Sequence, residues 1–192
     1  MKRKTIIATL LLGCSTVPAL LLSPSASKAS RNWHVAGYAG LVTHAQQRGL
    51  QVVLCGGPSV SERQLGTDIC AACPQPPLNL IGQTNLKQLM ALIQQVQLVL
   101  APDTGPTHMA TAAGVPVIGL YAHHNPQRTG PYRSRELVVS VYQPLMEAQS
   151  GRPLAELPWR SRLKDDQAMT RIQPQAVLET FDRFVQAHFP AQ

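Results

Sequence analysis

Residues 98–133 have the sequence LVLAPDTGPTHMATAAGVPVIGLYAHHNPQRTGPYR, which carries the clearest pattern of secondary structure in the chain. Its first four residues are an apolar run, which is long enough for a buried strand and too short for a helix. A turn-rich break follows at residues 102–106, and the small residues 107–113 favour a short helix that ends at Gly114. Residues 115–121 are again apolar and predict a second buried strand. The predicted order is therefore strand, loop, short helix, strand.

The loop between the first predicted strand and the short helix is suited to an anion. The unpaired N–H groups at a helix start and the helix dipole both favour negative charge. Ligands also collect at the carboxyl ends of strands in open parallel sheets. The sequence therefore predicts a phosphate-binding site at this loop.

The rest of the chain repeats the alternation of strand and helix. Further strands are predicted at residues 19–23, 51–55, 78–82 and 136–141. Helices are predicted at residues 34–49, after Ser59, after Asn85 and at residues 174–188. Residues 143–173 show little periodicity and predict a loop with short helical turns. The fold class that follows is α/β, with a Rossmann-like parallel sheet and helices on both faces.

Length and composition narrow the class of partner. A chain of 192 residues predicts one domain, and the formal net charge of +7 favours an anionic partner. Aromatic residues make up only 5% of the chain and are not interleaved with basic residues, which argues against a single-stranded nucleic-acid platform. The basic residues are spread along the chain. Two interpretations remain, a solvated basic surface and attraction to an anionic membrane face.

The N-terminal segment, residues 1–18, is distinct from the domain predicted at residues 19–192. Three of its first four residues are basic, and an apolar run follows and ends in Leu-Leu-Gly-Cys at Cys14. This pattern imitates a signal peptide, even a lipoprotein one. The alternative interpretation is the remnant of an interdomain linker. The apolar run is too short to be a permanent membrane span.

The central stretch also resembles a known family. Asp103-Thr104-Gly105-Pro106-x-His108-Met-Ala, then Ala-Gly-Val-Pro-Val, then an aromatic residue and Thr129-Gly-Pro, resemble the signature of glycosyltransferase family 9, the heptosyltransferases. These enzymes use ADP-heptose to build the lipopolysaccharide inner core. The resemblance implies the C-terminal, donor-binding half of a two-domain GT-B fold.

The resemblance also implies a set of donor-binding residues. The stretch Pro-Ser-Ala-Ser27 followed by Arg31 and Trp resembles the family's phosphate loop, with Ser25 in place of the usual glycine. An acidic ribose contact is expected at Glu62, whose alternative role is as a cap partner for the next helix. The implied donor-binding residues are Ser27, Arg31, Glu62, Thr84, Asp103, Thr104, Gly105, Pro106, His108 and Thr129.

The expected chemistry is metal-independent, inverting transfer from a nucleotide sugar, which is a substrate rather than a cofactor. Asp103 is expected to orient the sugar, and Arg31 to assist departure of the diphosphate, because fixed donors need not reorganise as charge develops. His108 is expected either to donate to phosphate or to pack. His123 and His124 cannot form a metal site alone, and no His-x-x-Glu pattern is present, so no metal is expected.

The functional expectation is a heptosyltransferase-like donor domain, truncated and lacking the acceptor domain, so that its activity as an enzyme stays open. Its expected location is the cytoplasm, at the periphery of the inner membrane, with a lipopolysaccharide core acceptor only if the missing domain is supplied. An exported lipoprotein-type binding module is the alternative. A Rossmann oxidoreductase is disfavoured because no G-x-G-x-x-G follows the first predicted strand.

Overall fold

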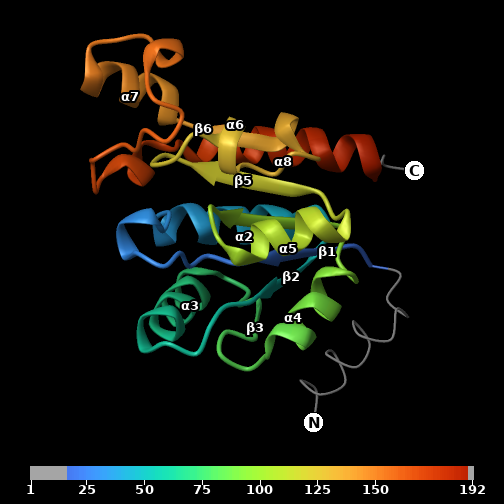
Figure 1. Ribbon diagram of the computed structural model, residues 1–192. Coiled ribbons are helices and arrows are strands. Elements are labelled where there is room, and N and C mark those ends of the chain that lie inside the picture. Colours follow the sequence, from blue (N-terminus) through green and yellow to red (C-terminus); the bar gives the residue numbers. More distant parts are fainter. Residues whose placement is uncertain (1–16, 190–192) are drawn as a thin grey trace.

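The computed structural model describes residues 17–189, and within them six parallel strands form one sheet with the order β3-β2-β1-β4-β5-β6 (Figure 1). The strands are β1 (Ala19–Leu22), β2 (Gln51–Leu54), β3 (Leu78–Asn79), β4 (Leu98–Pro102), β5 (Val117–Tyr121) and β6 (Val138–Ser140). The helices are α2 (Val35–Gln47), α3 (Val60–Ala72), α4 (Leu86–Ile93), α5 (Gly105–Ala113), α6 (Pro126–Thr129), α7 (Tyr142–Ser150) and α8 (Pro174–His188). Short 3-10 turns are η1 (Ala29–Arg31), η2 (Arg135–Leu137), η3 (Leu154–Glu156) and η4 (Ala168–Arg171).

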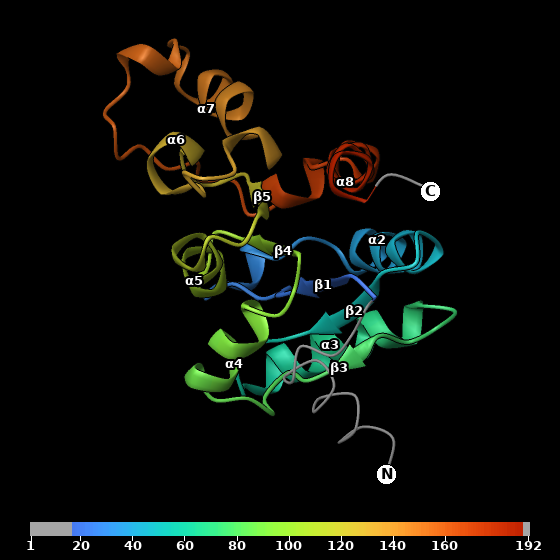
Figure 2. The ribbon, with the colours of Figure 1, turned by 90° about the vertical axis from the view of Figure 1, so that its right-hand side faces the viewer.

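Helices cover both faces of the sheet, as the sequence predicts. In Figure 2, α2 and α8 lie on one side of the strands, and α4 and α5 lie on the other. Two separate clusters of buried side chains match these layers, one including residues of α2, α3 and α8, the other residues of α4 and α5. The expected α/β fold with a Rossmann-like parallel sheet is confirmed.

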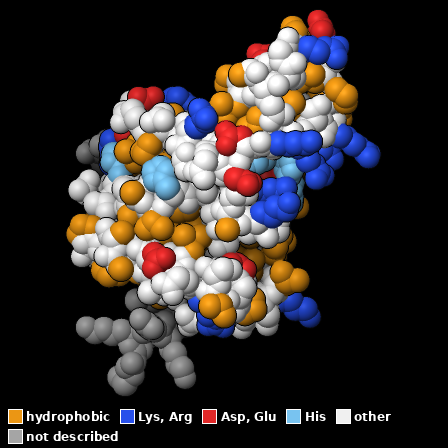
Figure 3. All heavy atoms as spheres, turned by 90° about the vertical axis from the view of Figure 1, so that its left-hand side faces the viewer, with side chains coloured by type: hydrophobic (Ala, Val, Ile, Leu, Met, Phe, Trp, Pro, Cys, Tyr) orange, Lys and Arg blue, Asp and Glu red, His pale blue; other side chains and the backbone are white. Residues whose placement is uncertain are grey.

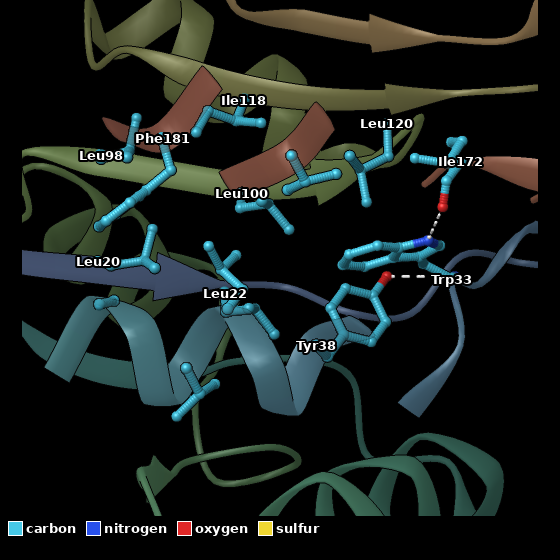
Figure 4. Packing of buried hydrophobic residues seen from close by; sticks show 14 of the residues in the cluster. Leu20, Leu22, Trp33, Tyr38, Leu98, Leu100, Ile118, Leu120, Ile172 and Phe181 are labelled. Carbon is cyan, nitrogen blue, oxygen red and sulfur yellow. Dashed lines mark hydrogen bonds between the residues drawn. The ribbon is translucent and has the colours of Figure 1, made fainter. Parts of the chain in front are cut away.

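Alternation along the strands supplies both cores. Leu20 and Leu22 of β1 point to the α2–α8 side, whereas Leu21 points to the α4–α5 side, and all three side chains are fully buried. Figure 4 shows Leu20 and Leu22 packed with residues of β4, β5 and α8. A continuous apolar run is typical of a strand buried on both faces, since successive side chains point in opposite directions.

The topology places the ligand-binding edge of the sheet. The strand order is that of doubly wound nucleotide-binding domains, and its direction reverses between β1 and β4. Both strands are parallel and in register at Leu22 and Leu100, and the amide of Ser23 donates to the carbonyl of Leu100 over 3.0 Å. The loops that follow β1 and β4 therefore start side by side at the edge formed by the carboxyl ends of the strands, here called the carboxyl edge.

Three predictions of secondary structure need correction. Of the strand predicted at residues 78–82, only Leu78–Asn79 form β3. The stretch predicted to be a loop from residue 143 begins with the nine-residue helix α7, which Tyr142 and Met146 anchor and Gly151 ends at φ 66°. With Leu145, which packs against the same core, Tyr142 and Met146 form an apolar stripe of a single turn, which is too short to establish a 3.6-residue period. The strand predicted at residues 136–141 is shorter, because residues 135–137 form the turn η2.

Within residues 17–189, no helix combines the length and apolar character needed to cross a bilayer. The apolar run of the N-terminal segment, on which the export interpretation depends, lies outside the described residues.

Candidate functional site

Asp103 is the centre of a compact polar cluster at the carboxyl edge. It directly follows β4, and its side chain is 16% exposed. The Nδ1–H of His124 donates to Asp103 Oδ2 over 2.5 Å, and the hydroxyl of Thr129 donates to the same oxygen over 3.2 Å. The other oxygen, Oδ1, lies 3.6 Å from Nε2 of His108 on α5. One carboxylate thus joins residues from the ends of β4 and β5, from α5 and from α6.

The position of Thr129 is fixed from within β5. The hydroxyl of Tyr121, the last residue of β5, donates to the carbonyl of Thr129 over 3.0 Å. Burial, together with the nearby charge of Asp103, raises the pKa of Tyr121, so its hydroxyl keeps its proton and remains a donor. Asn125 caps α6 through the amide of Gln127. The short helix α6 is therefore held against Asp103 from both ends.

The helix α5 begins beside this cluster. Thr104 is its N-cap and Pro106 lies in its first turn, as a proline suits a helix start. The Thr104 hydroxyl makes no capping bond, whereas the hydroxyl of Thr107 donates back to the carbonyl of Pro102 over 2.7 Å. A Cβ added to Gly105 would meet no atom of the chain within 4 Å. Packing therefore does not explain this glycine, and the space before it is open to a ligand.

The loop after β1 brings cations to the same edge. Its main chain is closed by a bond from the amide of Ala26 to Oδ1 of Asn32 over 2.7 Å. Trp33 holds its end, because the indole N–H donates to the carbonyl of Ile172 and the amide lies 3.3 Å from the hydroxyl of Tyr38 (Figure 4). Ser27 is exposed and Arg31 is half-buried on this loop.

A pocket of about 360 Å³ joins the β1 loop to the histidines after β5. It is lined by Lys28, Ser30, Arg31, His123, His124, Arg162, Leu163, Lys164, Asp165 and Asp166. Four cations against two carboxylates leave the pocket wall positive. On the face shown in Figure 3, Lys and Arg side chains gather beside histidines. Such a surface attracts an anion, and guanidinium groups suit phosphate in particular.

Arg162 and Lys164 were not predicted as site residues. They belong to residues 160–172, here called the return segment, which runs back past the end of β5. His124 and Arg162 form an antiparallel bridge, and the amide of Leu163 donates to the carbonyl of His123 over 3.1 Å. No sequence signal marks this pairing, because it depends on contacts between residues about 40 positions apart.

Four buried polar side-chain atoms lack a hydrogen-bond partner in the part of the chain that is described, and all four lie at this edge. They are Ser25 Oγ, Thr104 Oγ1, His123 Nδ1 and His124 Nε2. Buried polar groups are nearly always paired, so a cluster of unpaired ones indicates an absent partner. The atoms come from the loops after β1, β4 and β5, the three strands around the point where the strand order reverses.

Two predicted donor contacts lie outside this cluster. Glu62, in the first turn of α3, accepts from the amide of Gly57 over 2.6 Å and from the hydroxyl of Ser59 over 3.1 Å. Its alternative role as a cap partner is therefore observed. Thr84 lies just before α4, beyond β3 at the end of the sheet. Both are on the carboxyl edge, but in the strand order β1 separates Glu62 from Asp103, and β1 and β2 separate Thr84 from it.

Among residues 17–189, no group of three or more His, Cys, Asp or Glu side chains is placed to hold a metal ion.

Comparisons with known proteins bear on the same residues. A family model described as glycosyltransferase family 9 (heptosyltransferase) matches residues 6–157. The lipopolysaccharide core heptosyltransferase OpsX of Haemophilus influenzae is 48% identical over 159 residues, which are 83% of this chain and 46% of that protein. The lipopolysaccharide heptosyltransferase 3 of Escherichia coli K12 is 33% identical over 103 residues, 53% of this chain and 30% of that protein. The chain thus spans about half the length, or less, of these curated relatives.

Solved structures show the same fold. A family 9 glycosyltransferase from Veillonella parvula matches with a TM-score of 0.73 at 16% identity, covering 97% of this chain and 52% of that chain. The ADP-heptose lps heptosyltransferase II of E. coli matches with a TM-score of 0.70 at 24% identity, again over 97% of this chain and 52% of that chain. The family match spans the Asp103 cluster and the loop after β1, and together with the fold it shows that this chain belongs to glycosyltransferase family 9, the heptosyltransferases.

Proposed function

We propose that residues 19–192 form a donor-binding domain that holds a nucleoside diphosphate sugar, of the ADP-heptose class, for heptosyl transfer in lipopolysaccharide core synthesis. The observation on which this depends is the cluster of four unpaired buried polar atoms beside a cation-lined pocket at the carboxyl edge. Family membership and the printed activities of the relatives, which are lipopolysaccharide heptosyltransferases, support the choice of donor.

The diphosphate is proposed to lie between the loop after β1 and the start of α5. Arg31 and Lys28 approach from the first loop, and Arg162 and Lys164 from the return segment. The Thr104 hydroxyl is buried and unpaired at the helix start, where the helix dipole favours an anion. Ser27 and Pro106 adjoin this path, and Gly105 leaves it open. Fixed positive groups around the departing diphosphate stabilise the charge that develops during transfer.

Asp103 is proposed to act through orientation. Its carboxylate fixes the ring of His124 and the hydroxyl of Thr129, and it faces His108. Because Nδ1–H of His124 is used for Asp103, the unpaired Nε2 is the atom available to the donor. Glu62 and Thr84 are proposed as nucleoside contacts on the β2–β3 side of the diphosphate. For Glu62, this would add to the contacts that it already makes with its turn.

Transfer also needs an acceptor site and a group that activates the acceptor hydroxyl. This chain covers 46% of the length of its relative from H. influenzae. We therefore propose that the domain catalyses complete transfer only together with such an acceptor site. The net charge of +7 supports the peripheral contact with an anionic membrane surface that we also propose. For the N-terminal segment we propose the interdomain interpretation, since the family match takes in residues 6–18, and none of the comparisons supports the lipoprotein alternative.

Calorimetric titration tests the proposal. The chain is titrated with ADP, with ADP-heptose and with a nicotinamide dinucleotide. We expect saturable binding of the first two ligands at millimolar concentration or below, and no binding of the third. Binding of neither ADP nor ADP-heptose at millimolar concentration would overturn the proposed function, and preferential binding of the dinucleotide would favour an oxidoreductase.

A further inference from the structure

His123 is buried at the wall of the donor pocket and is not part of the Asp103 cluster. It is 9% exposed and follows β5 directly after Ala122. Its Nε2 lies 3.0 Å from the carbonyl oxygen of Asp165, and its Nδ1 has no partner. The neighbouring His124 uses its own Nδ1 for Asp103, so the two rings serve different partners.

The contact with Asp165 decides which nitrogen bears the proton. A carbonyl oxygen can only accept, so Nε2 must be the donor, and in the neutral ring Nδ1 then carries a lone pair and can only accept. Burial is the main cause that lowers the pKa of His123, and Arg31 and His124 act in the same direction. The hydrogen bond to Asp165 and the charge of Asp166 act in the opposite direction and are outweighed. The ring is therefore neutral near pH 7, and its unpaired acceptor is buried in a residue that lines the pocket.

An acceptor in a cationic pocket is not a phosphate contact, because a lone pair repels phosphate oxygens. The groups of a nucleoside diphosphate sugar that can satisfy it are the hydrogen-bond donors, chiefly hydroxyls. The strand order indicates which ones. The proposed nucleoside contacts follow β2 and β3, the diphosphate site follows β1 and β4, and His123 follows β5 on the far side. The part of the donor that extends toward β5 is the sugar.

We infer that His123 is a specificity-determining residue whose Nδ1 accepts a hydrogen bond from a hydroxyl of the transferred sugar. The inference rests on the proposed function. The hydrogen bond to His123 would distinguish the sugar nucleotide from the free nucleoside diphosphate. The return segment takes part by fixing the ring through the carbonyl of Asp165. The side chain of Asp165 is held separately by Arg171, whose Nε lies 3.5 Å from Oδ2.

The test compares ADP with ADP-heptose by calorimetry for the wild-type protein, His123→Phe and His123→Asn. Phenylalanine keeps the ring without an acceptor, whereas asparagine can place its amide oxygen near the position of Nδ1. We expect His123→Phe to weaken ADP-heptose binding about tenfold, the size of one buried neutral hydrogen bond, and to change ADP binding less than about twofold. His123→Asn should recover most of the loss. The matched control is His188→Phe on α8, whose Nδ1 is paired with the carbonyl of Phe184.

Equal weakening of ADP and ADP-heptose, or no change in either, would overturn the inference while leaving the proposed function intact. Should His123→Phe fail to fold, the wild-type protein is titrated with ADP-heptose analogues that each lack one hydroxyl. We expect one analogue to bind about tenfold more weakly than the parent sugar nucleotide. If no analogue does so, the inference is wrong. If the wild-type protein binds neither ADP nor ADP-heptose, the proposed function fails first and the inference fails with it.

Discussion

The carboxyl edge has two halves that differ in whether their polar groups are hydrogen-bonded within the chain. In the loops after β2 and β3, Glu62 accepts from the Gly57 amide and the Ser59 hydroxyl, and Asn85 and Gln88 form a reciprocal capping box. In the loops after β1, β4 and β5, here called the switch-point loops, four buried polar atoms have no partner within the described residues. Both halves are made of short polar loops, so loop composition does not explain the difference.

The difference shows which loops have polar atoms that a ligand can still pair with. A buried polar atom without a partner costs about 1–3 kcal/mol, and a ligand that pairs with it recovers this cost on binding. The β2–β3 loops have already used their polar groups to stabilise the fold. Substitutions in the switch-point loops should therefore mainly change affinity, and those in the β2–β3 loops should mainly change stability, except at the proposed nucleoside contacts Glu62 and Thr84.

Asp103→Asn is expected to give the largest effect. It removes the charge that orients His124 and Thr129, and affinity for ADP-heptose should fall about thirtyfold, since charged hydrogen bonds contribute about 2 kcal/mol. Calorimetry measures the affinity, and thermal unfolding checks the fold. The matched control is Asp182→Asn, which disrupts a second Asp–His pair, with His44 at 2.8 Å between α2 and α8. That variant should lose stability and keep its affinity, and an equal loss of affinity in both would contradict the comparison.

Arg31→Ala should rank second. Loss of one guanidinium from the pocket is expected to weaken ADP binding about tenfold, and the loss should shrink as salt is added, because salt screens the attraction that Arg31 exerts in the wild-type protein. Arg48→Ala is the control of equal charge, since Arg48 lies at the end of α2 before β2, at the opposite edge of the sheet, and pairs with Asp182. A similar loss of ADP affinity in both variants would show that only the net charge of the protein matters and not the position of Arg31.

Gly105→Ala should have effects of opposite sign on stability and affinity. The added methyl group meets no atom of the chain, so the free energy of unfolding should stay the same or rise by about 0.5 kcal/mol. ADP affinity should fall about fivefold, because the methyl group blocks close approach to the start of α5. Gly40→Ala in α2 is the control, since a Cβ there also meets nothing. Unchanged affinity in Gly105→Ala would place the diphosphate away from this helix.

Ser59→Ala should have the smallest effect on binding. Its hydroxyl caps α3 by accepting from the amide of Glu62, and losing this cap should cost about 1 kcal/mol of stability, measured by denaturant unfolding. ADP affinity should change less than about twofold. A tenfold loss of affinity would show that the Ser59–Glu62 contact serves the nucleoside, and the two halves of the edge would then not differ as described.

Much of the fold follows from local pattern. Buried strands such as β4 and β5 are short apolar runs bounded by turn residues, and Asn85, Ser59 and Gly114 end or begin helices as their residue types predict. The helix α7 does not follow from the pattern, because the apolar stripe that anchors it, Tyr142, Leu145 and Met146, covers a single turn. The local sequence is enough to predict a helix or strand that buries a long apolar stripe of its own. It is not enough where a segment distant in the sequence determines which side chains are buried.

The features of the site also fall into two groups, those that are local in the sequence and those that depend on distant contacts. The sequence alone determined that Asp103, Thr104 and Gly105 follow a buried strand and that Arg31 follows another, because strand ends and helix starts are local features. The pairing of His124 with Asp103 and the approach of Arg162 to the pocket depend on the packing of the whole chain. Those contacts join residues 21 and 38 positions apart, and their partners are chosen by the strand order and by burial. Neither the strand order nor the burial can be inferred from the residues of one segment alone.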